Sequence, residues 1–164
     1  MNKRYNLTMM SILAIFFIAM DQLTKYIIVK TMNVGDSVPV IGDILEITSH
    51  RNHGAAWGML QNQMTFFYII TVVVLLAIAF FYYKEAAFNP VMQLGLTLIF
   101  AGAIGNFIDR IMRGNVVDFI DTKIINYDFP IFNIADSCLT IGVIVLLYDM
   151  LFNQKEEKRN GRNI

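Results

Sequence analysis

The chain has 164 residues, of which 56% are hydrophobic and only 16% are charged, and its mean hydropathy is +0.53. A soluble domain of this length cannot bury so large a share of apolar side chains, so the composition indicates a membrane protein. The 13 basic and 13 acidic residues give a net charge of zero, which provides no electrostatic basis for binding nucleic acid.

Four apolar stretches are long enough to cross a bilayer as helices, which takes about 20 residues. In chain order they are residues 7–29, 64–83, 91–112 and 131–152. The first stretch follows Lys3 and Arg4, as a signal peptide would, but it continues through Asp21 and Lys25 without a small-residue cleavage pattern. We therefore expect it to be retained, and we expect residues 1–164 to form a single membrane-embedded domain.

The basic residues predict how these helices are oriented. Seven of them fall near the two ends of the chain and in the turn at 84–89, whereas four fall in the loops 30–63 and 113–130. The positive-inside rule then places both termini in the cytoplasm and both longer loops outside.

The outer loops have structure of their own in this interpretation. Residues 38–48 mix β-branched and polar side chains around Pro39 and Gly42, a pattern that predicts short strands on the membrane surface. Residues 54–60 are small and amphipathic and include Trp57, which suits the headgroup region, so we expect a short outer amphipathic helix. The predicted fold is an all-α polytopic membrane protein with four transmembrane helices and a small extracytoplasmic β-structure.

The unusual polar residues share one depth, near the outer ends of the predicted spans. They are Asp21, Lys25, Asn106, Asp109, Arg110, Asp118, Asn133 and Asp136. Asp21 and Lys25 are one helical turn apart and can form an ion pair. The inner halves of all four spans are nearly uniformly apolar. The sequence therefore predicts a polar site close to the outer interface.

Asp118 and Asp136 are the strongest candidates for chemistry within this layer. An ionised carboxylate near hydrocarbon costs several kcal/mol, roughly 2.5–3.5 at a helix centre, so it is rarely present without a role. On one continuous helix the two would be about 27 Å apart, but they can meet if the third and fourth spans are antiparallel. Gly102 and Gly105 would allow such a close approach of a neighbouring helix.

A pair of nearby carboxylates suggests acid and base catalysis. Two such groups tend to share one proton, so that one activates water while the other protonates the scissile carbonyl, as in aspartic peptidases. For each aspartate taken alone, a helix cap or a structural ion pair is an equally good explanation. The pair, taken with the surrounding layer, favours catalysis.

Other hydrolytic sites have little support. The sequence contains no His-Glu-x-x-His motif, no Gly-x-Ser-x-Gly motif and no Asp-Thr/Ser-Gly motif. His50 and His53 lie in an outer loop without an obvious third ligand, so we expect no metal. Cys138 lies two residues after Asp136, a spacing that turns the two side chains about 200° apart on a helix, and we expect it to be a small buried hydrophobe.

Five segments of the chain, taken together, form a recognisable set. They are residues 21–25 (DQLTK), 52–57 (NHGAAW), 102–110 (GAIGNFIDR), 116–119 (VVDF) and 132–136 (FNIAD). In order and spacing they resemble the five sequence blocks of the bacterial lipoprotein signal peptidase family, also called signal peptidase II. One departure is Ala101, where the family often has a second glycine before Gly102.

This resemblance implies a membrane-embedded aspartic endopeptidase that removes the signal peptide from bacterial prolipoproteins by cutting before a diacylglyceryl-modified cysteine. The family's two catalytic aspartates correspond to Asp118 and Asp136. The positions that shape or support the site correspond to Asp21, Lys25, Asn52, Gly54, Asn106, Asp109, Arg110, Asn133 and Ala135. We expect Asp21 with Lys25, and Asp109 with Arg110, to orient the helices and loops around the pair.

The resemblance also implies a fold of four transmembrane helices with an outer β-cradle and a mobile outer helix. It implies a monomer in the bacterial cytoplasmic membrane, with the active site near the outer face. The expected ligands are lipid-modified signal peptides, membrane lipids and globomycin-type cyclic peptide inhibitors. Neither a metal nor an organic cofactor is expected.

Two other classes of membrane protein remain as alternatives. A small proton-coupled transporter or channel subunit would also carry intramembrane charges, but along its full depth and often with an internal repeat. A structural scaffold would need no carboxylate pair. Activity against a lipidated precursor distinguishes the peptidase from both.

Overall fold

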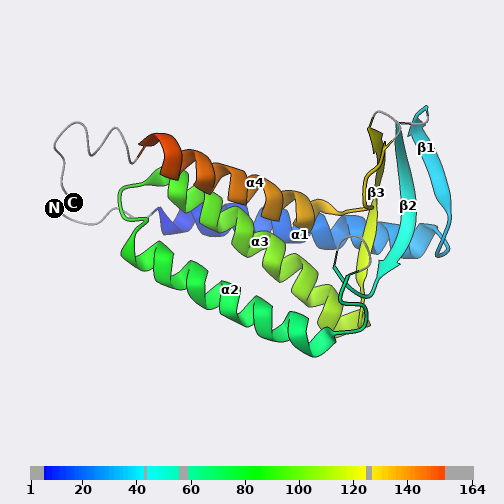
Figure 1. Cartoon of the computed structure of the whole chain (residues 1–164), viewed down its shortest axis with the longest axis horizontal. Coiled ribbons are helices and arrows are strands. Elements are labelled where there is room, and N and C mark those ends of the chain that lie inside the picture. Colours follow the sequence, from blue (N-terminus) through cyan, green and yellow to red (C-terminus); the bar gives the residue numbers. More distant parts are fainter. Residues whose placement is uncertain (1–5, 43, 56–58, 125–126, 154–164) are drawn as a thin grey trace.

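The computed structural model describes residues 6–42, 44–55, 59–124 and 127–153. Four helices form an elongated bundle with a small sheet at one end (Figure 1): α1 (Leu7–Thr31), α2 (Met64–Lys84), α3 (Pro90–Arg113) and α4 (Ile134–Tyr148). A π-helical turn, Asp149–Asn153, continues α4. The helices at Leu7–Thr31, Met64–Lys84, Pro90–Arg113 and Ile134–Phe152 are long and apolar enough to cross a membrane. The four predicted transmembrane helices are therefore confirmed.

Helix α3 lies at the centre of the bundle and contacts each of the other three helices. It begins at a proline preceded by Asn89, whose side chain accepts a hydrogen bond from the Met92 amide (2.9 Å). Proline fits the first helical turn because the amide it lacks would be unpaired there. The helix ends at Gly114, which adopts the left-handed conformation (φ 67°) that favours glycine.

The end of the bundle opposite the α2–α3 turn carries a four-stranded antiparallel sheet in the order β1-β2-β3-β4 (Figure 1). Its strands are β1 (Ser37–Ile41), β2 (Leu45–Asn52), β3 (Val116–Ile124) and β4 (Tyr127–Asp128). The sequence analysis placed strands only in the first outer loop, whereas the second loop supplies β3 and β4. Val117 and Phe119 of β3 pack on Ile28 of α1, so burial against the first helix stabilises a strand that its sequence alone did not reveal.

The expected outer amphipathic helix at 54–60 includes residues 56–58, and therefore Trp57, which lie outside the described residues. On either side, Gly54 and Ala55 form a bend and residues 59–62 form turns.

The half of the bundle away from the sheet, which we expected to be nearly uniformly apolar, contains a few buried polar residues at its end. Gln93 of α3 is buried there, accepts a hydrogen bond from the Asn6 amide (3.1 Å) and donates one to the Ala86 carbonyl (2.9 Å). Nearby, the Asn89 side chain donates to the buried carboxylate of Asp149 (2.7 Å). These polar residues connect the ends of α1, α3 and α4 that lie away from the sheet, and their hydrogen bonds offset the cost of burying them.

Candidate active site

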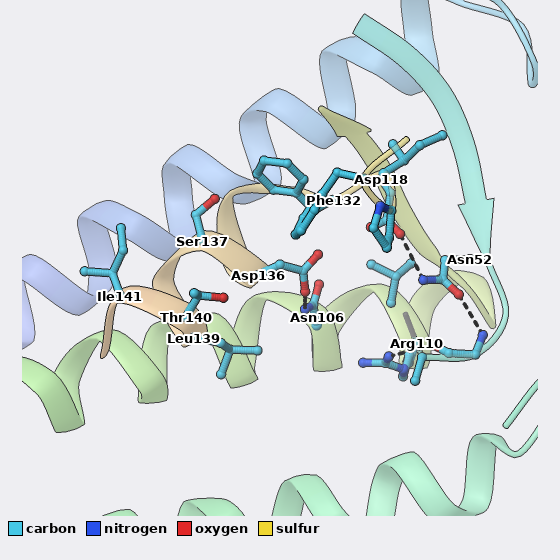
Figure 2. Close-up of a pocket in the computed structure, with 16 residues that line it drawn as sticks. Asn52, Asn106, Arg110, Asp118, Phe132, Asp136, Ser137, Leu139, Thr140 and Ile141 are labelled. Carbon is cyan, nitrogen blue, oxygen red and sulfur yellow. Dashed lines mark hydrogen bonds between the residues drawn. The ribbon is translucent and has the colours of Figure 1, made fainter. Parts of the chain in front are cut away.

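The two candidate aspartates meet because the chain before α4 folds back onto β3. Phe132 accepts hydrogen bonds from the Phe119 and Ile120 amides (3.0 and 2.8 Å), and its own amide donates to the Ile120 carbonyl (3.0 Å). This pairing places the beginning of α4 beside Asp118, the third residue of β3. Both carboxylates line one cavity of about 570 Å³ near the sheet end of the bundle (Figure 2).

Asp136 is also part of a helix cap. The Asn133 side chain accepts a hydrogen bond from the Asp136 amide (2.9 Å), and the Asp136 carboxylate accepts one from the Asn133 amide (3.2 Å). This reciprocal capping box satisfies two amides at the beginning of α4. The capping role and a catalytic role are compatible, because only Asp136 Oδ2 takes part in the cap.

Neutral amides hold the remaining oxygens of the pair. Asn106 Nδ2 donates to Asp136 Oδ1 (2.7 Å), as Figure 2 shows. Asn133 Nδ2 donates to Asp118 Oδ1 (2.6 Å), and Asn52 Nδ2 donates to Asp118 Oδ2 (3.0 Å). Each of the four carboxylate oxygens therefore accepts a hydrogen bond, and none of these donors carries a formal charge.

Asp118 is 1% exposed, and this burial has an electrostatic consequence. Burial, and to a smaller extent the negative charge of Asp136, raise the pKa of Asp118 from 3.8 to about 7. The amide hydrogen bonds from Asn52 and Asn133 oppose this rise because they stabilise the ionised form. A pKa near 7 suits a group that must gain and lose a proton at neutral pH.

A buried lysine, Lys25, lies next to Asn106, the residue that donates to Asp136. Lys25 Nζ lies 2.9 Å from Asp21 Oδ2 and 3.2 Å from Asp109 Oδ2, and it donates a hydrogen bond to Asn106 Oδ1 (3.0 Å). All of its hydrogen-bonding capacity is thus used in a place with no exposure to solvent. Removing one member of such a buried group typically costs about 3–5 kcal/mol, because the others are left unpaired.

Asp21 and Asp109 also hold the backbone on either side of the cavity. Asp21 Oδ1 accepts a hydrogen bond from the Ala135 amide (2.9 Å), and Asp109 Oδ2 accepts one from the Val117 amide (3.1 Å). Ala135 directly precedes Asp136, and Val117 directly precedes Asp118. The lysine cluster therefore fixes the backbone at both members of the pair.

Asp109 and Arg110, which we expected to orient the site together, contact different partners in the structure. Asp109 pairs with Arg113 (2.5 Å), which is one helical turn further along α3. Arg110 points into the cavity, where its guanidinium lies 4.3 Å from the centre of the Phe67 ring and donates to the Gly54 carbonyl (3.4 Å). Adjacent helical residues point about 100° apart, so the two side chains reach different neighbours.

The sequence analysis missed Arg113 and Phe67 as neighbours of the site. The i, i+4 spacing of Asp109 and Arg113 is a signal that could have found the first. No comparable signal exists for Phe67, because it comes from α2 and its position depends on how the helices pack.

Glycines permit the close contact of α3 with α1 and α4. A Cβ atom at Gly105 would lie 2.7 Å from Asp21 Oδ2 and 3.0 Å from the Ala135 Cβ, and one at Gly102 would collide with the Ala135 carbonyl oxygen. Gly54 is similarly confined, because an added Cβ would collide with the Met59 carbonyl oxygen. The predicted close approach of a helix at Gly102 and Gly105 is thus explained by the position of Ala135.

The wall of the cavity on the α4 side is largely apolar. Leu139 and Ile141 of α4, together with Phe129 and Phe132 from the segment before it, line this side. Ser137 and Thr140 also line it and add two hydroxyl groups. The cavity therefore has a polar floor formed by the carboxylates and an apolar wall along a membrane-spanning helix.

Two other sequence candidates lie apart from this chemistry. Cys138 is buried and does not line the cavity, which agrees with the expected direction of its side chain. Within the described ranges, His, Cys, Asp and Glu side chains form no group of three or more that could hold a metal ion. Burial and the neighbouring Arg51 lower the pKa of His50.

Comparisons with known proteins extend over nearly the whole chain. A family model for signal peptidase (SPase) II matches residues 13–152. Lipoprotein signal peptidases of Staphylococcus aureus strains JH9 and Newman are each 55% identical over 158 residues, covering 96% of this chain and 97% of each relative. Two solved structures of a bacterial membrane enzyme are also similar. One has a TM-score of 0.90 at 52% identity, covering 100% of this chain and 98% of that one, and the other has 0.86 at 56%, covering 93% and 98%.

Proposed function

The chain belongs to the signal peptidase II family, and from this we propose that it is an aspartic endopeptidase that removes signal peptides from bacterial prolipoproteins. The proposed cleavage lies just before a cysteine that already carries a diacylglyceryl group. Asp118 and Asp136 would supply the acid and the base, and water would be the nucleophile.

The observation that supports this proposal best is the arrangement of the two carboxylates. They come from different elements, line one cavity, and are held by amides rather than by direct ion pairs. A direct ion pair with a cation would keep a carboxylate permanently ionised, whereas neutral donors leave the pair able to exchange a proton. This is the requirement for alternating acid and base roles.

In the proposed mechanism, one carboxylate is ionised and the other carries the shared proton. The ionised group removes a proton from water as the water oxygen attacks the scissile carbonyl carbon, and the protonated group donates its proton to the carbonyl oxygen. The tetrahedral gem-diol intermediate then collapses. The scissile C–N bond breaks and the leaving amine takes the proton from the protonated carboxyl group. A hydroxyl group of the gem-diol gives its proton to the ionised carboxylate as the product carboxylic acid forms, so one shared proton remains on the pair.

The shape and polarity of the cavity suit a lipid-modified substrate. The apolar wall along α4 can face the apolar helix of a signal peptide, while the polar floor faces the bond to be cut. The acyl chains can stay in the surrounding lipid. We expect globomycin-type cyclic peptides to occupy the same cavity. All the proposed site residues come from one chain, so we expect a monomer to be sufficient.

The test is cleavage of a diacylglyceryl-modified precursor by purified Asp118→Asn, Asp136→Asn and double variants. Asparagine keeps the shape of aspartate but can neither accept nor share the proton, so each single variant should be inactive. The double variant should be hardly worse, because both groups serve one chemical step. Asp121→Asn, a carboxylate lost from the same strand, is the matched control and should remain active. Substantial turnover by either active-site variant rejects the pair.

The proposed orientation places the sheet and the cavity outside and the α2–α3 turn in the cytoplasm. The bias of Lys and Arg supports it. Labelling of single cysteines introduced at His50 and Lys84 into a Cys138→Ala background should modify the first from outside intact cells, and the second only after permeabilisation. Labelling of Lys84→Cys from outside contradicts this topology.

A further inference from the structure

Lys25 fixes which atoms donate and which accept in the hydrogen bonds that lead through Asn106 to Asp136. An ammonium group has donors and no acceptor, so the Asn106 atom that faces it must be the amide oxygen. The Asn106 NH₂ group then necessarily faces Asp136 Oδ1, at 2.7 Å. In most sites the orientation of an amide is ambiguous, but here the buried cation determines it.

The other two amides are oriented by backbone amides instead. The Asn133 oxygen accepts from the Asp136 amide (2.9 Å) and the Asn52 oxygen accepts from the Gly54 amide (2.9 Å). Their NH₂ groups therefore face Asp118. Asp118 thus receives two hydrogen bonds from amides that neutral groups polarise, whereas one of the two amides that donate to Asp136, the Asn106 side chain, is polarised by a cation.

A further feature favours a negative charge on Asp136 over one on Asp118. Asp136 lies in the first turn of α4, where the unpaired amides of a helix N-terminus stabilise an anion, while Asp118 lies on a strand. The charged groups that act on the pair are Asp21 and Lys25 of α1 and Arg110 of α3, and Asp109 of α3 contacts Lys25.

From this geometry we infer that Lys25 is a positioning residue that acts through Asn106 to keep Asp136 ionised, so that Asp118 carries the shared proton in the free enzyme. The inference rests on the proposed function, and it assigns Asp136 as the base toward water and Asp118 as the acid toward the carbonyl oxygen. The raised pKa of Asp118, to which the charge of Asp136 contributes, agrees with this order.

The test reads the protonation of each carboxyl group without substrate. The infrared carbonyl band of a protonated carboxyl group is titrated in Asp118→Asn, where Asp136 remains, and in Asp136→Asn, where Asp118 remains. Spectra of the double Asn variant are subtracted to remove all other carboxyl groups. Asp136 should ionise at a lower pH than Asp118, by about one pH unit or more. The opposite order, or equal midpoints, overturns the assignment.

The role of Lys25 is tested by adding Lys25→Met to each single Asn variant. The midpoint of Asp136 should rise by about one pH unit, because an opposite charge is lost, and that of Asp118 should change less. Arg113→Met is the matched control, since it removes a cation from the same cluster that does not contact Asn106. Equal changes at both carboxyl groups, or an equal effect of Arg113→Met, overturn the role of Lys25.

Two precautions keep the outcomes distinct. If Lys25→Met does not fold, the order of the two midpoints in the single Asn variants still decides which carboxyl group ionises first. Because no substrate is used, a failure of this order differs from a failure of the proposed function, which only the cleavage assay reports.

Discussion

Replacing Asp118 by asparagine should stabilise the folded protein at neutral pH while abolishing its activity. Asp118 is 1% exposed, and burial together with the charge of Asp136, the smaller cause, raises its pKa from 3.8 to about 7. Each pH unit between the folded and unfolded values is worth about 1.4 kcal/mol. Ionisation of Asp118 therefore lowers the free energy of unfolding by up to about 4 kcal/mol near pH 7. This is an upper limit to the gain from asparagine, because the asparagine side chain cannot accept all the hydrogen bonds that Asn52 and Asn133 donate to the aspartate.

The direction of the pH dependence follows from the raised pKa. Below about pH 4 the carboxyl group is protonated in both folded and unfolded chains, so asparagine should give no advantage. As the pH rises toward 7, Asp118 ionises in the unfolded chain but stays largely protonated in the folded chain. The wild-type protein therefore loses stability relative to the variant. The difference in Tm, variant minus wild type, should therefore increase between about pH 4 and pH 7 and then level off.

The assay is a series of thermal melts of purified protein in one detergent across this pH range. Asp121→Asn, on the same strand, is the control for general effects of charge removal. A difference in Tm between Asp118→Asn and the wild type that stays constant from pH 4 to pH 8 would refute the argument, because it would mean that ionisation of Asp118 does not oppose folding.

Three further substitutions test other parts of the site. Gly105→Ala should lower the stability by roughly 1–3 kcal/mol, seen as a lower Tm, because its methyl group would crowd Asp21; an unchanged Tm contradicts this packing. Cys138→Ala should keep most of the activity against a lipidated precursor, and an inactive but folded variant would argue for a thiol nucleophile. Arg110→Lys should reduce kcat/KM about tenfold, on the order of 1–2 kcal/mol, because lysine cannot reproduce the planar contact with Phe67; wild-type kcat/KM would exclude this contribution.

The helices could be predicted from the sequence because their signal is local. A stretch of about 20 apolar residues is sufficient to define a membrane span, and the chain supplies capping residues such as Asn89 and Asn133 close to the predicted starts. The fourth helix begins at Ile134 rather than at 131 because the chain before Asn133 pairs with β3. That pairing joins Ile120 and Phe132, which lie in separate segments, so no local sequence pattern predicts it.

The sheet could be predicted only in part for the same reason. The first loop shows an alternation around Pro39 and Gly42 that indicates strands. In β3 both Val116 and Val117 are buried, and so are Asp118 and Phe119. A strand buried on both faces loses the alternation by which strands are recognised, and here it carries one of the two candidate catalytic residues.

Residue types were sufficient to identify the residues of the site, whereas the contacts between them depend on how the helices pack. The sequence identified the carboxylates, amides and lysine because polar groups are costly near hydrocarbon, but it assigned Asp109 and Arg110 one joint supporting role. In the structure Asp109 contacts Lys25 and Arg113, while Arg110 points into the cavity. The hydrogen-bond direction that starts at Lys25 depends on contacts between α1, α3 and α4. It is therefore a property of the folded chain, and the titrations of Asp118 and Asp136 examine it directly.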